Sequence, residues 1–107
     1  MTFNAVFGQG GKVRTELYID FGDAEKNKTL FDLLSEQKEE IHHSFEGELE
    51  WEPMDEKRAS RITVYRDGSI DATEEELVQI KDWHIETLVR MKKTLTPFIK
   101  RKLKHLG

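Results

Sequence analysis

Residues 12–21 (KVRTELYIDF) alternate strictly between apolar or threonine side chains and polar ones, and this stretch constrains the fold more than any other. A period of two residues is typical of a β-strand that is buried on one face only. Such a face must pack against other elements, because one strand cannot bury it alone. The chain is therefore expected to build a sheet with one covered side.

A hairpin partner precedes this strand. Phe3, Ala5 and Phe7 alternate with the residues between them, and residues 8–11 (GQGG) supply turn residues. The same glycines do not match a phosphate-binding loop, since the G-x-x-x-x-G-K-[ST] pattern is missing and no helix is predicted next.

A helix is predicted over residues 23–45, with Asp23 as its N-cap. Gln37 interrupts an otherwise apolar stripe. The apolar residues of that stripe are Leu30, Leu33, Leu34, Ile41 and Phe45.

A second hairpin follows, with strands at residues 48–52 and 59–66 and a tight connection over residues 54–58. Leu49 and Trp51 alternate with glutamates, and Pro53 ends the first of the two strands because it lacks an amide N–H.

The last helix begins with a capping box at residues 73–76 (TEEE). We expect Pro97 to stop or kink it and a shorter helix to span residues 98–106. Apolar residues are frequent enough to predict a well-buried helix: Leu77, Val78, Ile80, Trp83, Ile85, Leu88, Val89, Met91 and Leu95.

These elements predict one α+β domain over residues 1–107, a two-layer ββαββα arrangement. Two antiparallel hairpins form the sheet, two helices cover one face, and the last helix is kinked at Pro97. With no cysteine, the domain must be stable without disulfides or thiolate metal sites. The absence of cysteine and of long apolar runs predicts a cytoplasmic protein with no membrane segment.

Charge is divided unevenly along the chain. Residues 87–107 hold seven basic and no acidic residues, whereas the other 86 hold ten basic and all 21 acidic ones. Clustered Lys and Arg on one helix are the electrostatic signature of DNA or RNA binding, although they also compensate a helix dipole. The candidate contacts are Arg90, Lys93, Lys100, Arg101 and Lys104.

A catalytic alternative rests on Asp55 and Lys57, whose D-x-K spacing is used by Mg²⁺-dependent nucleases. Such a site also needs a second carboxylate from a neighbouring strand, and Asp20 is the only strand-borne aspartate in the predicted elements. Because Asp55 and Lys57 fall in a predicted turn, we expect no catalytic residue, metal or cofactor here.

The histidines favour structural roles. His42 and His43 are adjacent, so they point about 100° apart on a helix and are expected to be solvated. His84 lies within the apolar stripe of the last helix, and Gln37 interrupts the earlier one. Our hypothesis is that Gln37 and His84 are buried polar residues that satisfy backbone groups between the helices and the sheet.

The outer sheet face carries two tyrosines and two arginines, as a platform for stacking nucleic-acid bases would. Its glutamates instead predict a surface that neutralises itself.

Four stretches, in order and spacing, resemble the domain-of-unknown-function family DUF4268: ELYID, LFDLLSEQKEEI, LEWEPMDEKRASRITVYR and DWHIETLVRMKKTLTPFIKR. The resemblance covers roughly residues 13–102. It implies a bacterial or archaeal domain that often follows PD-(D/E)XK nuclease-like regions. In that family a further strand precedes the region of residues 3–7, so the chain is expected to be a minimal version or a fragment. An apolar residue is common at the position of His84, which argues against a family-wide role for this histidine.

We therefore expect a non-catalytic accessory or interaction domain, associated with nucleic-acid processing of the restriction or defence type, with a nuclease-like partner. The alternatives are a small Mg²⁺-dependent nuclease and a structural or dimerisation module that uses an open sheet edge.

Overall fold

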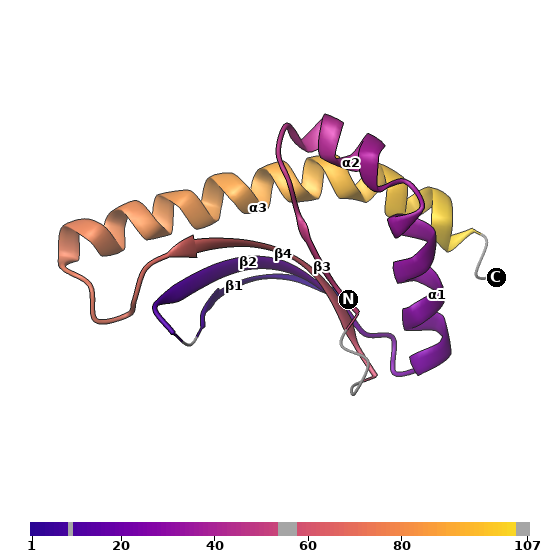
Figure 1. The fold of residues 1–107 in the computed structure, drawn as a ribbon, viewed down its shortest axis with the longest axis horizontal. Coiled ribbons are helices and arrows are strands. Elements are labelled where there is room, and N and C mark those ends of the chain that lie inside the picture. The colour runs from indigo at the N-terminus through magenta and orange to yellow at the C-terminus, as the bar shows by residue number, and fades with distance from the viewer. Residues whose placement is uncertain (9, 54–57, 105–107) are drawn as a thin grey trace.

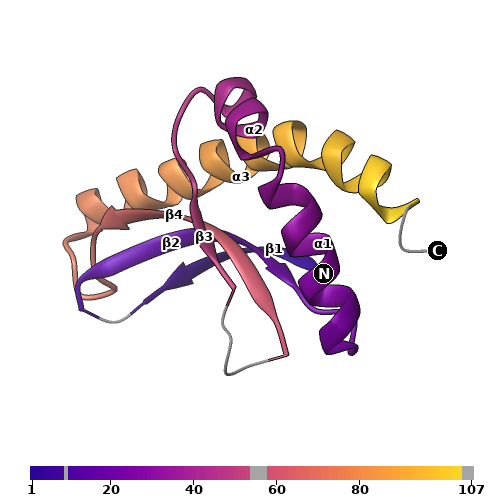
Figure 2. The same cartoon turned by 45° about the vertical axis from the view of Figure 1, so that its right-hand side comes forward.

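The computed structural model describes residues 1–8, 10–53 and 58–104, and within them a four-stranded antiparallel sheet is packed against three helices (Figures 1 and 2). The strand order β1-β2-β4-β3 leaves β1 and β3 at the edges. The predicted α+β class with two antiparallel hairpins is confirmed. The elements are β1 (Thr2–Phe7), β2 (Lys12–Ile19), α1 (Ala24–Ser35), α2 (Lys38–Phe45), β3 (Glu50–Glu52), β4 (Ser60–Asp67) and α3 (Glu74–Leu103).

Strand β2 lies at the centre of the sheet and sets its register. Leu17 pairs with Phe3 of β1 and with Ile62 of β4, so these apolar side chains share one face. That face meets all three helices in a single core. The core residues are Leu17, Ile19, Leu30, Phe31, Leu34, Ile41, Phe45, Leu49, Ile62, Met91, Leu95, Phe98 and Ile99.

The predicted helix over residues 23–45 is two helices. Asp23 caps α1 as expected, accepting hydrogen bonds from the N–H groups of Glu25 and Lys26. The chain then turns at Gln37, and α2 runs at a steep angle to α1 (Figure 1). This break lets Leu34 and Ile41 both reach the core, since α1 packs against β4 and α3 while α2 packs against α3.

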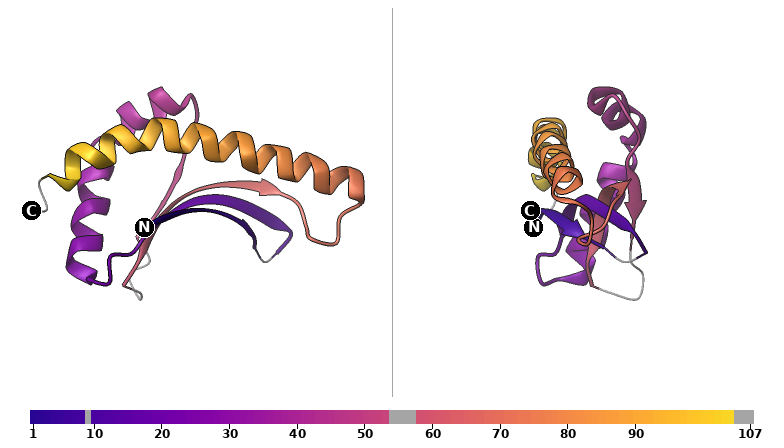
Figure 3. Two further views of the ribbon diagram at one scale, coloured as in Figure 1. Left: turned by 180° about the vertical axis from the view of Figure 1, so that it is seen from behind. Right: turned by 90° about the vertical axis from the view of Figure 1, so that its left-hand side faces the viewer.

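Helix α3 runs without interruption through Pro97, so the separate helix predicted over residues 98–106 is wrong. It arches along the sheet, and its last turns descend towards α1 (Figure 3). Proline removes one helical hydrogen bond, that to the carbonyl of Lys93. Phe98 and Ile99 are buried directly after it, and their packing holds the helix in place despite that loss.

The predicted burial of α3 is only partly correct. Ile80 and Met91 are buried, but Val78, Ile85 and Val89 are 55%, 54% and 60% exposed. One flank of α3 therefore stays exposed to solvent. No helix in the described ranges is both long and apolar enough to span a membrane.

Candidate nucleic-acid interface

Four of the basic residues predicted to contact nucleic acid lie on the C-terminal half of α3, and the fifth, Lys104, is its C-cap. Arg90, Lys93, Lys100 and Lys104 recur at intervals that keep them on one side of a helix, and Arg101 extends the same side. We call these five residues the basic stripe. At 1.5 Å per residue it extends for about 21 Å. Four members are exposed and Arg90 is half-buried.

The residues of the basic stripe form no ion pair in the part of the chain that the structure describes. Helix α3 carries no acidic residue beyond Glu86. The partial negative charge at a helix C-terminus offsets only about half a unit. A positive potential therefore extends from this surface into solvent.

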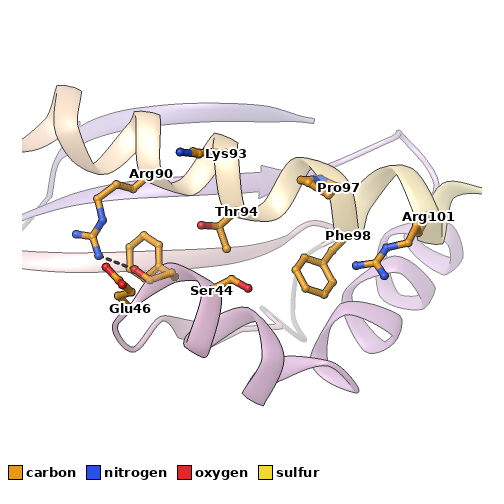
Figure 4. Close-up of a pocket in the computed structure, with 9 residues that line it drawn as sticks. Ser44, Glu46, Arg90, Lys93, Thr94, Pro97, Phe98 and Arg101 are labelled. Atoms are coloured by element: carbon orange, nitrogen blue, oxygen red, sulfur yellow. Dashed lines mark hydrogen bonds between the residues drawn. The ribbon is translucent and has the colours of Figure 1, made fainter.

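A groove of about 610 Å³ separates this part of α3 from the end of α2. In Figure 4, Arg90 and Arg101 mark its two ends, and Thr94 and Phe98 point between them towards Ser44. Lys93 lies at its rim, whereas Lys100 and Lys104 are outside the lining. Guanidinium and hydroxyl groups are the usual donors to phosphate oxygens.

Arg90, at one end of the groove, makes contacts that connect α3 to α2. Its Nη2 donates to the backbone oxygen of Phe45 at 2.6 Å, and its guanidinium carbon lies 4.4 Å from the centre of the Phe45 ring. The oxygen belongs to the last residue of α2, where helical carbonyls lack intrahelical partners. Arg90 therefore ties α2 to α3 and is not a freely available phosphate ligand.

Arg101 is placed differently. Its guanidinium lies 4.6 Å from the ring centre of the buried Phe98, which orients the group while leaving it exposed to solvent. Lys93, Lys100, Arg101 and Lys104 are thus the members of the basic stripe that remain free to meet an anion.

The D-x-K residues Asp55 and Lys57 lie outside the described residues. Asp20, the third member of that hypothetical site, is occupied by other contacts. Its two carboxylate oxygens accept from Arg58 at 2.9 and 2.8 Å, and Oδ1 also accepts from the Gly22 N–H and from Asn27. The Arg58 hydrogen bonds lower the pKa of Asp20 most, followed by that from Gly22. Asp20 anchors the end of β2 to α1 and to the start of β4.

No group of three or more potential metal ligands occurs among the described residues.

His84 and Gln37 do not satisfy backbone groups through their side chains as the hypothesis proposed. His84 is 6% exposed, and its Nδ1 lies 2.9 Å from the Thr15 hydroxyl. Burial lowers the pKa of His84, and the nearby charge of Arg66 lowers it further. Gln37 is half-buried at the α1–α2 break, where its backbone N–H, not its side chain, donates to Leu34.

His42 is not solvated, contrary to the prediction. Its Nε2 accepts from the backbone N–H of Leu49 at 3.2 Å and from the Trp51 indole N–H at 3.0 Å. It therefore fixes the start of the second hairpin on α2. Because its partners lie seven and nine residues away in a loop and a short strand, no helical or strand periodicity marks this role.

The outer sheet face neutralises itself, as predicted. Arg14 pairs with Glu16 at 2.6 Å, and Arg61 pairs with Glu52 at 2.9 Å. Tyr65 also donates to Glu52, at 2.7 Å. Burial raises the pKa of Glu52, but the hydrogen bonds from Arg61 and Tyr65 outweigh it and leave that pKa below its usual value. These arginines and glutamates are therefore engaged with each other, whereas Glu50 of the same face is exposed and forms no ion pair in the described ranges.

Comparison with known proteins gives one family. The model of a domain of unknown function, DUF4268, matches residues 1–99. Comparisons with curated proteins and with solved structures found no significant match.

Proposed function

Because the chain belongs to the domain-of-unknown-function family DUF4268, whose description assigns no activity, we propose a function from the geometry: a non-catalytic accessory domain that binds the phosphate backbone of a nucleic acid along the basic stripe. In this proposal the chemistry is performed by a nuclease-like partner of the restriction or defence type, in the cytoplasm.

One observation carries the proposal. Lys93, Lys100, Arg101 and Lys104 line one side of a single helix, are exposed, and form no ion pair in the described ranges. Three arginines elsewhere, Arg14, Arg58 and Arg61, are by contrast each paired with a carboxylate. Unpaired clustered cations on a net acidic protein favour a polyanionic ligand over simple solubility.

The arrangement fits backbone contact and not base reading. The basic groups are spaced along the helix at intervals of one or two turns, about 4.5 to 10.5 Å. The groove between α2 and α3 is lined by two hydroxyls, by the cations Arg90, Lys93 and Arg101, and by one carboxylate, that of Glu46. Phosphate contacts of this kind position a protein on nucleic acid without selecting sequence. We therefore expect weak discrimination between sequences.

The test is a binding titration with labelled single-stranded and double-stranded oligonucleotides at low salt. The variant Lys93→Glu/Lys100→Glu reverses two charges of the basic stripe and is expected to weaken binding at least tenfold. The matched control is Lys26→Glu/Lys28→Glu, which makes the same charge change on α1. Equal affinity of the two variants would overturn the assignment of the basic stripe.

A further inference from the structure

Strand β1 is an edge strand that lacks the usual protections against pairing with another chain. Its six residues (TFNAVF) include no charged residue and no proline. The opposite edge, β3, has only three residues, two of them glutamates, and Pro53 follows it. Natural sheets protect their edges with short strands, charges and prolines of this kind. Within the described ranges, β1 pairs with β2 alone.

The backbone groups of β1 that face outward can be identified from the register. Gly8 donates to the carbonyl of Lys12 at 2.9 Å, and Phe7 pairs with Val13. In an antiparallel ladder alternate residues bond to the neighbouring strand, so the N–H and C=O groups of Phe3, Ala5 and Phe7 point away from β2. The N–H and C=O groups of these three residues are therefore available to pair with another strand.

The same three residues are self-complementary. If two copies of β1 run antiparallel with Ala5 opposite Ala5, then Phe3 of each copy lies opposite the partner's Phe7. All six side chains then share the face that carries the core, and every residue pair is of the hydrogen-bonded kind. A slip of one residue would place Phe3 on the opposite face from its partner, so this register is favoured.

Helix α3 provides an apolar surface beside this edge. The rings of Phe7 and His84 are 6.0 Å apart, and Lys92 Nζ lies 5.7 Å from the Phe3 ring, so α3 runs antiparallel to β1. Apolar residues of both elements form a shallow groove between them. They are Ala5, Phe7, Leu77, Ile85 and Leu88, with His84 and Lys81 completing the lining.

This groove continues into the open flank of α3. Val78, Ile85 and Val89 are seven and four residues apart, which keeps them on one flank, and each is more than half exposed. Exposed apolar side chains scattered singly need no explanation, but a row of them beside an unprotected sheet edge indicates a contact surface.

The distribution of charge along α3 indicates that a second copy of this chain fits the β1 edge. A two-fold axis at Ala5 would run the two α3 helices antiparallel. The half of α3 up to Glu86 carries five acidic residues and one lysine, whereas the half beyond it carries only basic ones. Each acidic half would then lie along the basic half of the other copy.

We propose that the chain forms a symmetric homodimer, in which two β1 strands pair about Ala5 into one continuous sheet and the open flanks of α3 meet beside them. This proposal does not depend on nucleic-acid binding.

The first test is disulfide crosslinking of single-cysteine variants, which is simple because the sequence has no cysteine of its own. In Ala5→Cys the two thiols are brought together by the two-fold axis, at a Cα separation of about 5.5 Å, which a disulfide accepts. In the control Thr2→Cys the equivalent residues are offset by six positions, about 20 Å. We expect Ala5→Cys to oxidise to a disulfide-linked dimer at least tenfold faster than Thr2→Cys at the same dilute concentration. Equal rates would overturn the register.

The second test measures mass in solution by light scattering over a range of concentrations. The expected mass approaches twice 12.6 kDa as concentration rises. Ile85→Glu should shift the protein towards monomer, whereas Gln79→Glu, an exposed change on the other flank, should not. A wild-type chain that stays monomeric throughout would overturn the proposal, as would a dimer that Ile85→Glu leaves intact. Circular dichroism confirms that both variants are folded.

Discussion

Replacing Arg90 with methionine should destabilise the domain far more than the same change three residues later. Methionine keeps the aliphatic stem but removes the hydrogen bond to the Phe45 carbonyl and the guanidinium above the ring. A hydrogen bond from a charged donor contributes about 1.5–3 kcal/mol, and a partly exposed cation–π contact about 0.5–1 kcal/mol. Because Arg90 is half-buried, we take the lower part of the combined range and expect a loss of about 2 kcal/mol.

Lys93→Met is the matched control, since this exposed side chain should change stability by less than about 0.5 kcal/mol. Equilibrium unfolding in urea, followed by tryptophan fluorescence, measures both variants, with equal m-values required for the comparison. If Arg90→Met and Lys93→Met unfold at the same midpoint, then Arg90 does not tie α2 to α3, and the reasoning is refuted.

Three other changes have defined outcomes. His42→Ala leaves the Leu49 and Trp51 N–H groups without an acceptor and should cost about 2 kcal/mol in the same unfolding assay, while an unchanged midpoint would contradict that role. Folding lowers the pKa of His84, so the unfolded chain binds its proton at a higher pH than the folded chain does, and thermal stability should fall as pH drops below 6.5. His84→Asn should flatten this pH dependence. Parallel stability curves for the variant and the wild type would exclude His84 as the cause. The pKa of Asp20 is also lowered, so its contribution to stability is present above pH 3.8 and is lost as pH falls below that value. Asp20→Asn should remove this part of the acid unfolding. An acid transition that the variant leaves unaltered would count against this role.

The sequence was sufficient to predict the sheet, because its alternation and turns are local signals. Residues 12–21 and the GQGG turn determine the first hairpin, whose Gly10 and Gly11 have positive φ angles of 70° and 72°. Asp23 and Thr73 were identified as N-caps from side-chain chemistry alone, and both accept the expected backbone hydrogen bonds.

Features that depend on tertiary packing could not be predicted in this way. At the break at Gln37 the chain redirects α2 along α3, while α1 packs on both β4 and α3. The helix α3 continues through Pro97 because the residues after it are buried. The sequence placed the basic stripe on the last helix. It could not separate Arg90, which holds a carbonyl of α2, from Lys93, because that distinction depends on a residue 45 positions away.

The most direct test of the proposed function is the salt dependence of oligonucleotide binding. Four free cations that each neutralise one phosphate predict a slope of about −3 for log K against log salt concentration on single strands. Lys93→Glu/Lys100→Glu should reduce its magnitude by at least one. A slope near zero, or no binding by the wild-type chain at low salt, would contradict the proposal that the basic stripe holds a phosphate backbone.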